Sequence, residues 1–200
     1  MKAYKQTIGN TNIYSLPKQD ETLYYKYVEN TWVQPTISSD GTLGGNRFAC
    51  KASSVNSSDN PYKAFDSNNE TQFTLNANTG TMTIYNPVAI KISSVSIRNG
   101  YQSSWVRAIT SGTIYGSNDN ASWTQLKTFT NSNKTVSAVW SIDMSTNSNY
   151  YKYYRFDIKG DGEYARITGM TITATQKDVV AGTAEDYDYK EVTSKYYAIK

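Results

Sequence analysis

The sequence contains no histidine, and this absence removes several kinds of chemistry at once. Histidine-based catalytic triads, histidine general bases and histidine-ligated zinc sites are all excluded. There is one cysteine, Cys50, so the chain cannot form an internal disulfide. Cys50 lies in the strand-like run RFACKAS, and we expect it to be a small buried apolar residue rather than a nucleophile.

Charge and long apolar runs are scarce as well. Charged residues make up 18% of the 200 residues, and the formal net charge is +3. The 20 lysines and arginines are scattered, which argues against a nucleic-acid partner. No apolar stretch approaches the length that spans a bilayer, and residues 1–18 lack the apolar core of a secretory signal. We therefore expect no membrane insertion, and synthesis in a cytoplasm.

What the chain does contain favours β-structure. Serine, threonine and asparagine are abundant and there are 18 tyrosines, a composition typical of all-β surface modules. Apolar residues recur at every second position in the middle of the chain, as in YYRFDIK, where Tyr154, Phe156 and Ile158 share one face. About eight such strands, separated by polar turns, predict an all-β fold: an antiparallel β-sandwich or jelly roll without a sustained helix.

The alternation changes face at two places. One is Ser93-Ser94 in VAIKISSVSIRN, and the other is Gly169 in RITGMTITAT. An extra residue in one strand shifts the face on which the next side chains lie, so we expect a β-bulge or bend at each position.

Composition divides the chain into three zones. Residues 1–46 combine tyrosine-rich segments with Pro and Gly breakers, and we interpret them as an N-terminal arm that could anchor the protein. Residues 47–175 carry the strand pattern and form the predicted sandwich. Residues 176–200 become charged and irregular again, as a tyrosine-rich C-terminal extension.

Oxygen-bearing side chains are concentrated in the run NPYKAFDSNNETQF at residues 60–73. Such a run is either a loop that binds a hard cation or a turn in which Asp66 and Asn68 bond to backbone N–H groups. Both interpretations stay open at this point, and in both the run has a structural role.

Four segments, in order, resemble the galactose-binding-like β-sandwich of discoidin domains and family 32 carbohydrate-binding modules. They are NPYKAFDSNNETQF, ISSVSIRN, the hairpin TIYGSNDNASWTQLKTF, and the closing pair YYRFDIKG with ARITGMTIT. The resemblance covers roughly residues 47–175 and implies the galactose-binding-like fold. It does not fix a function, because one fold carries many binding roles.

The resemblance implies a structural Ca²⁺ in the Asp66 loop. Backbone carbonyls of Lys63 and Asn68, the carboxylate of Asp66, and the hydroxyl and carbonyl of Thr71 would supply its ligands. The family usually adds a Glu from the last strand, where this sequence has Gly169, so we expect weakened calcium binding. Glu70 is a candidate replacement for that Glu.

The ligand site of relatives includes the loop that here reads RNGYQSSWVRAITSG. A sugar-binding loop needs an exposed aromatic ring with polar neighbours, and this loop supplies the candidates Arg98, Asn99, Tyr101, Trp105 and Arg107. Alternatively, Trp105 packs back on the end of the sandwich and Arg107 is a solvated surface group. Two other tryptophans, at positions 123 and 140, have strand settings that predict core positions.

We expect no enzymatic activity. The acidic residues lie mostly in turns or in the C-terminal zone, and none has an evident apolar pocket that would raise its pKa for glycoside hydrolysis. The sequence shows no nucleophile elbow and no phosphate-binding loop.

The leading hypothesis is a non-catalytic carbohydrate-binding adhesion module of a bacteriophage particle. The terminal zones resemble those of phage appendage proteins, which leave the host by lysis; a virion location would follow, with a cell-surface glycan and other virion proteins as partners and several copies per assembly. The alternative is a structural virion subunit, such as a head fibre, decoration or tail-assembly protein, whose arms order on assembly. A bacterial surface adhesin, located on the extracellular surface, is the third hypothesis.

Overall fold

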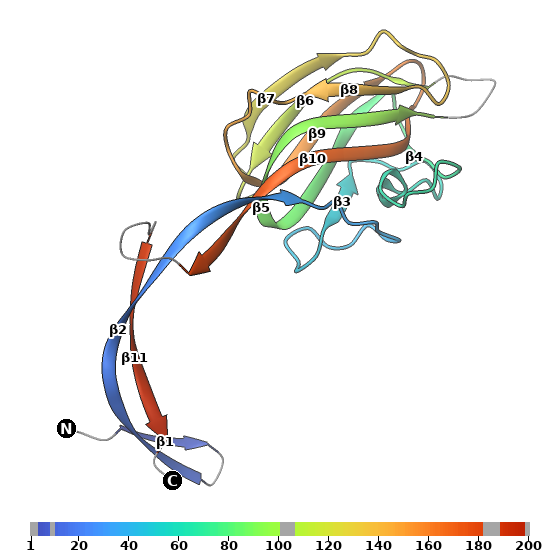
Figure 1. The fold of residues 1–200 in the computed structure, drawn as a ribbon. Coiled ribbons are helices and arrows are strands. Elements are labelled where there is room, and N and C mark those ends of the chain that lie inside the picture. The colour runs from blue at the N-terminus through green and yellow to red at the C-terminus, as the bar shows by residue number, and fades with distance from the viewer. Residues whose placement is uncertain (1–3, 9–10, 101–106, 182–188, 199–200) are drawn as a thin grey trace. The chain divides into compact units, whose positions relative to one another are not determined.

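The protein is described by a computed structural model, which defines residues 4–8, 11–100, 107–181 and 189–198 (Figure 1). Among these residues the fold is all-β with one 3₁₀ turn, as predicted. The strands and the turn are β1 Tyr4–Ile8, β2 Thr11–Trp32, β3 Ala49–Ala52, the 3₁₀ turn Pro61–Ala64, β4 Phe73–Leu75, β5 Thr79–Asn99, β6 Ile109–Ser117, β7 Thr124–Thr130, β8 Val139–Asp143, β9 Tyr151–Gly160, β10 Ala165–Ala181 and β11 Tyr189–Ala198. In the described part of the chain, no helix has the length and apolarity needed to cross a membrane.

The sandwich has two layers that share one long strand, β5. Its first part, residues 79–85, pairs with β3 and β9, and β9 continues the first layer through β6 to β7. Its second part, residues 90–99, pairs with β10 and β8 in the second layer, where β4 pairs with β10. All of these pairings are antiparallel. The predicted antiparallel sandwich is confirmed.

A corner in β5 joins the two layers. The pairing of β5 with β9 breaks between Tyr85 and Ile90, at the Asn86-Pro87 dipeptide that the sequence marks as a turn. The chain there bends without leaving the strand, and Figure 1 shows the ribbon of β5 curving round. Because β5 doubles back at this corner, its two ends, Thr79 and Asn99, both lie at the opposite end of the sandwich.

The hydroxyl of Tyr154, on β9, holds the second part of β5 against the first layer. Its O–H donates to the carbonyl oxygen of Ile90 at 2.7 Å, and its oxygen accepts from the N–H of Ile92 at 3.3 Å. Tyr154 is 1% exposed, and burial raises the pKa of its hydroxyl. The neutral phenol therefore remains a hydrogen-bond donor throughout the physiological pH range.

Both predicted changes of face are β-bulges. In the pairing of β10 with β5, Ser93 is an extra residue opposite the step from Thr173 to Ala174. Thr168, next to Gly169, is the extra residue opposite the step from Asn99 to Arg98. Each bulge keeps apolar residues on the buried side after the pattern has shifted by one residue.

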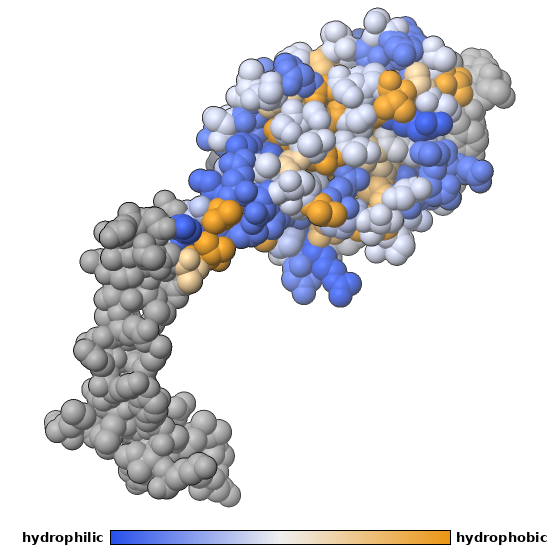
Figure 2. Space-filling model, in the orientation of Figure 1, coloured by the Kyte–Doolittle hydropathy of each residue, from blue (hydrophilic) through white to orange (hydrophobic). Residues whose placement is uncertain are grey.

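The core between the layers consists of the residues that apolar alternation along the strands predicted to be buried. Tyr154, Phe156 and Ile158 of β9 are at most 4% exposed, and Cys50 is 1% exposed. Burial, together with the neighbouring Asp40 carboxylate, raises the pKa of the Cys50 thiol, as expected for an unreactive core cysteine. On the visible surface, apolar side chains are scattered among polar ones (Figure 2).

The two tryptophans predicted in the core have different surroundings. Trp140 packs against the core, with its ring centroid 5.7 Å from that of Phe129, as predicted. The prediction for Trp123 was wrong: this half-buried residue lies on the outward side of the first layer, over the guanidinium group of Arg155. Strand alternation does not tell which face of a sheet is outward, and Trp123 directly follows a turn, where alternation has not begun.

The boundary between arm and sandwich differs from the prediction. Residues 30–176 form one compact unit, so residues 30–46 belong with the sandwich rather than with the N-terminal arm. The side chain of Gln34 explains why: its Nε2 donates to the carbonyl of Met170 at 2.9 Å and its Oε1 accepts from the N–H of Ile172 at 2.6 Å. The side-chain amide of Gln34 thus makes the hydrogen bonds to β10 that the backbone of a neighbouring strand would otherwise make.

The second unit comprises residues 1–29 and 177–200. Its β1 pairs with β2, from Tyr4 opposite Ser15 to Ile8 opposite Thr11. The C-terminal β11 pairs with β2 as well, from Tyr189 opposite Tyr25 to Ala198 opposite Ser15. The two terminal zones, predicted as separate irregular extensions, are thus strands of one antiparallel sheet.

We predict that Tyr154→Phe destabilises the sandwich by about 1–3 kcal/mol, since it removes a buried hydroxyl and leaves Ile90 and Ile92 without that partner. Urea unfolding followed by fluorescence measures the change. Tyr153→Phe is the matched control, because Tyr153 lies half-buried on the outward side of the same strand. Equal stability of the two variants would contradict the role assigned to the Tyr154 hydroxyl.

Candidate functional site

Four chain segments meet at the end of the sandwich where β5 ends. They are residues 99–100, 107–108, 131–138 and 160–166. Backbone hydrogen bonds join them: the N–H of Asp161 donates to the carbonyl of Ala108 at 3.0 Å, and the N–H of Arg166 donates to the carbonyl of Arg107 at 2.8 Å. The flanking residues Gly100 and Arg107 are therefore bonded to the other segments, and we call this group of four segments the end-loop site. Two of the predicted ligand residues, Tyr101 and Trp105, lie outside the described residues.

Asn99 is a buried residue that holds the loops at this end of the sandwich together, and it is not an exposed ligand-binding group. It is 0% exposed. Its Nδ2 donates to the carbonyls of Asn133 and Thr135 at 2.9 and 3.0 Å, and its Oδ1 accepts from Nε1 of Trp140 at 2.9 Å. The carbonyl of Asn99 accepts from the hydroxyl of Thr168 at 2.9 Å. With its amide occupied in this way, Asn99 can position the loops, but the structure does not support the predicted direct contact with a ligand.

Arg107 lies at the base of the 101–106 segment and forms a cation–π pair. Its guanidinium carbon is 4.3 Å from the centroid of the Tyr164 ring, and both residues are half-buried. Lys134 and Asp161 form an exposed ion pair of 3.1 Å at the same end. The guanidinium group of Arg107, the ring of Tyr164 and the charged groups of Lys134 and Asp161 could all contact a polar ligand.

Arg98 is placed differently from Arg107. It lies on β5 between the buried residues Ile97 and Asn99, on the side of the second layer that faces away from the core. A Cβ atom at Gly169 would lie 3.7 Å from the Cβ of Arg98 and 3.6 Å from Oδ1 of Asn69. The structure thus places Arg98 beside Gly169, whereas Arg107 lies over Tyr164.

The sequence analysis missed Tyr164, Lys134 and Asp161. A signal was present for two of them, because KGDGEYAR is a turn between two strongly alternating strands. That turn must lie at the same end as the 99–108 loop once β9 pairs with β6. Lys134 had no comparable signal.

The Asp66 loop is closed by hydrogen bonds within itself. The carboxylate of Asp66 accepts from the N–H of Asn68 at 2.9 Å and from the hydroxyl of Thr71 at 2.6 Å. The carbonyl of Asn68 accepts from the same hydroxyl at 2.9 Å and from the N–H of Thr71 at 3.3 Å. Three of the four predicted calcium ligands are therefore occupied with one another.

This donor set fits a capped turn better than a calcium site. Lys63, the fourth predicted ligand residue, places its Nζ 3.5 Å from the carboxylate of Asp59. Glu70 is exposed and its N–H donates to Oδ1 of Asn68 at 2.9 Å. Within the described ranges no group of three or more His, Cys, Asp or Glu side chains lies close enough to hold a metal ion. Calcium sites in proteins generally use several carboxylates, and fewer of them give weaker binding.

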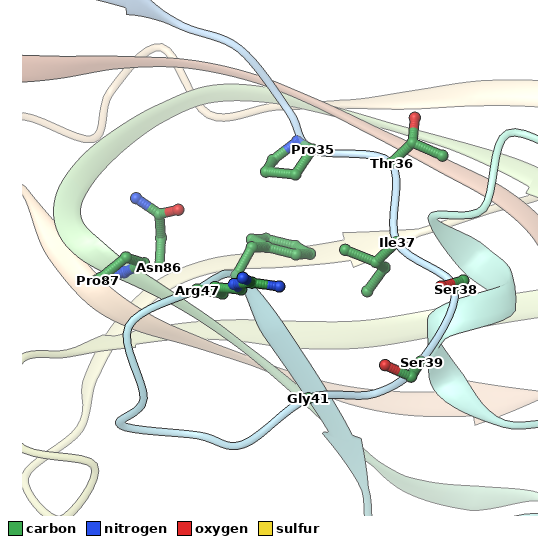
Figure 3. A pocket seen from close by; sticks show the side chains of 10 residues that line it. Pro35, Thr36, Ile37, Ser38, Ser39, Gly41, Arg47, Asn86 and Pro87 are labelled. Atoms are coloured by element: carbon green, nitrogen blue, oxygen red, sulfur yellow. The ribbon is translucent and has the colours of Figure 1, made fainter.

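A pocket of about 480 Å³ lies next to the corner of β5. In Figure 3, Asn86 and Pro87 form one side of it and Ile37 comes from the other side, with Arg47 between them. The pocket is at the opposite end of the sandwich from the end-loop site. None of the predicted site residues lines it.

Comparison with solved structures identifies the architecture. The galactose complex of the family 32 module of NanJ from C. perfringens superposes with a TM-score of 0.54 at 20% identity, over 63% of this chain and 93% of that one. The module of AlyQ in complex with 4,5-unsaturated mannuronic acid gives 0.51 at 23% identity, over 62% and 92%. The CBM32-1 and CBM32-2 domains of ZmpB from C. perfringens, in complex with GalNAc, give 0.55 at 17% identity, over 64% and 34%.

The sandwich has the fold of family 32 carbohydrate-binding modules. At these identities the likeness establishes the galactose-binding-like fold and nothing finer. No family model matches the sequence, and a search of curated proteins finds no match.

We predict that calcium leaves the thermal stability unchanged, because the oxygens of the Asp66 loop are already hydrogen-bonded. Melting is measured in a chelator and at about 1 mM calcium, the range of the weaker protein sites. Asp66→Ala should lower the free energy of unfolding by about 1–2 kcal/mol, as loss of a capping side chain does. Glu70→Ala, in the same loop, is the control and should have no effect. A rise in Tm with calcium that Asp66→Ala abolishes would show a cation site instead.

Proposed function

We propose that the protein is a non-catalytic glycan-binding module that holds a sugar at the end-loop site. The observation that carries the proposal is the Arg107–Tyr164 pair at the base of the segment containing Tyr101 and Trp105. Stacking of a ring on the C–H face of a sugar, with a cation and amides for its hydroxyls, needs this combination on fixed loops.

The comparisons support a sugar as the ligand class. Three modules with this fold were solved with galactose, GalNAc or an unsaturated mannuronic acid. These ligands belong to those proteins, and we transfer to this chain only the class: a monosaccharide unit of a cell-surface glycan. In this proposal Trp105 or Tyr101 supplies the stacking ring, Arg107 bonds hydroxyl groups, and Asn99 positions the loops.

A second candidate function rests on the terminal unit. The pairing of β1 and β11 with β2 gives the protein a sheet made of strands from its two terminal zones. Paired terminal strands suit attachment to a larger assembly. We propose a phage particle as that assembly, with the chain present in several copies, and a structural virion subunit without sugar binding as the alternative function.

Titration calorimetry of the full chain with galactose, N-acetylgalactosamine and mannuronate tests the first proposal. We expect saturable binding of one of them and a loss of about tenfold or more in affinity in Trp105→Ala, equivalent to at least ~1.4 kcal/mol. Val88→Ala, an exposed apolar residue beside the β5 corner, is the control and should bind normally.

Two outcomes would contradict the proposal. Unchanged binding in both Trp105→Ala and Arg107→Gln would place the sugar elsewhere on the protein. Absence of binding to these sugars and to an array of host-envelope glycans, together with assembly of the chain into oligomers, would favour the structural subunit.

A further inference from the structure

A continuous polar surface runs along β9 on the outward side of the first layer. Its members on β9 are Tyr153, Arg155, Asp157 and Lys159, which alternate with the buried residues of the core. We call this surface the β9 face. The four side chains span three two-residue steps of a strand, or about 20 Å.

One part of the β9 face is aromatic. The guanidinium carbon of Arg155 lies 4.7 Å from the ring centroid of Tyr115 and 4.8 Å from that of Trp123. Nε of Arg155 donates to Oδ1 of Asp157 at 2.8 Å. Arg155 is therefore held beside two half-buried rings by a carboxylate, while its side chain remains 28% exposed.

Trp123 is positioned by the turn that precedes it. The carboxylate of Asp119 accepts from the N–H groups of Ser122 at 2.8 Å and Ala121 at 2.9 Å, and these bonds hold its pKa well below its usual range. These bonds order the turn directly before Trp123.

The other part of the β9 face is a shallow groove of about 380 Å³. Its lining includes three threonine hydroxyls and one charge of each sign, beside two glycines and Ile158; the residues are Thr79, Gly80, Thr81, Gly112, Thr113, Asp157, Ile158 and Lys159. The lining residues come from three neighbouring strands, β5, β9 and β6, near the end of β9. Hydroxyl, carboxylate and ammonium groups along a groove suit a polar, extended ligand.

The charge of this surface is positive. Lys51 pairs with Thr83, which pairs with Arg155, so these side chains form one row across the first layer. Lys51, Arg155 and Lys159 are opposed by Asp157 alone among the residues named here. The surface is also poor in exposed apolar groups: the large exposed apolar side chains of the described residues lie elsewhere, at Tyr27, Val33, Val88, Val139, Val179 and Val180.

We propose that the β9 face is a second binding site, for an acidic oligosaccharide that lies along β9 with its carboxylates near Arg155 and Lys159. The site uses no residue of the end-loop site. It would bind several sugar units at once, and it would therefore prefer a chain of uronic acids to a single unit.

The test uses the full chain and two probes of equal length, a hexamer of mannuronate and a neutral hexamer of glucose. We expect the acidic hexamer to bind, the neutral one to bind at least about tenfold more weakly, and added salt to weaken binding of the acidic hexamer. Measurements in the Trp105→Ala background remove the end-loop contribution, so that failure of this proposal is distinguishable from failure of the first.

Arg155→Gln should reduce affinity for the acidic hexamer about tenfold or more, since a charge-assisted fork is lost. Lys159→Gln, at an exposed position that leaves the fold intact, should reduce it about threefold. Lys152→Gln is the matched control, because Lys152 is exposed on the same strand but outside the β9 face. Binding of a single sugar at the end-loop site should be unchanged in all three variants.

Wild-type affinity in both Arg155→Gln and Lys159→Gln would overturn the proposal. Equal affinity for the acidic and neutral hexamers would overturn the assigned ligand class. Sedimentation that shows an oligomer of the wild type and a monomer of Arg155→Gln would assign this face to a contact between copies of the chain, which also overturns the proposal.

Discussion

The corner of β5, with the Tyr154 hydroxyl that holds it, is the constraint on which the remainder of the sandwich depends. One strand belongs to both layers, so the two layers cannot move apart without breaking the bonds to Ile90 and Ile92. A buried hydroxyl that satisfies a carbonyl and an N–H at such a corner stabilises it, because these groups would otherwise lose hydrogen bonds away from water. The same corner returns β5 to the end at which it began, and thereby brings Asn99 beside the loops that follow β7 and β9.

Asn99, at the end of β5, then fixes the loops of the end-loop site through its hydrogen bonds. Its amide reaches the β7–β8 loop and Trp140, while backbone bonds tie Arg107 and Ala108 to the β9–β10 turn. Binding groups on loops are most effective when a rigid scaffold fixes their ends. The Asp66 loop follows the same physical rule with hydrogen bonds between Asp66, Asn68 and Thr71. In both places, side-chain amides and hydroxyls order loops that carry few apolar contacts.

The end-loop site and the β9 face offer different chemistry. The first combines Arg107 with Tyr164 on loops at one end of the sandwich. The second lies on the outward side of a sheet, where Arg155 lies beside two rings and near a groove lined by residues of β5, β9 and β6. In the two proposals, the loops would bind one sugar unit, whereas the sheet surface would gain affinity from repeated contacts along a chain. A module with both sites would bind one sugar unit of a polysaccharide at the end-loop site and the negatively charged, extended chain at the β9 face.

Alternation along the strands predicted the all-β class, the buried face of β9 and bulges at Ser93-Ser94 and Gly169, because it records which side chains leave water; the second extra residue is the neighbouring Thr168. The run around Asp66 was also located from the sequence, with a hydrogen-bonded turn as one of its two predicted interpretations, since turn residues act over a few positions. The burial of Asn99, the hydrogen bonds of Gln34 to β10 and the pairing of both terminal zones with each other emerged from the three-dimensional structure. So did the position of Tyr115, on β6, and Trp123, directly before β7, beside Arg155 of β9. Alternation is a local record of burial, whereas such neighbours are set by the order of strands in the sheet, which no short segment of sequence contains.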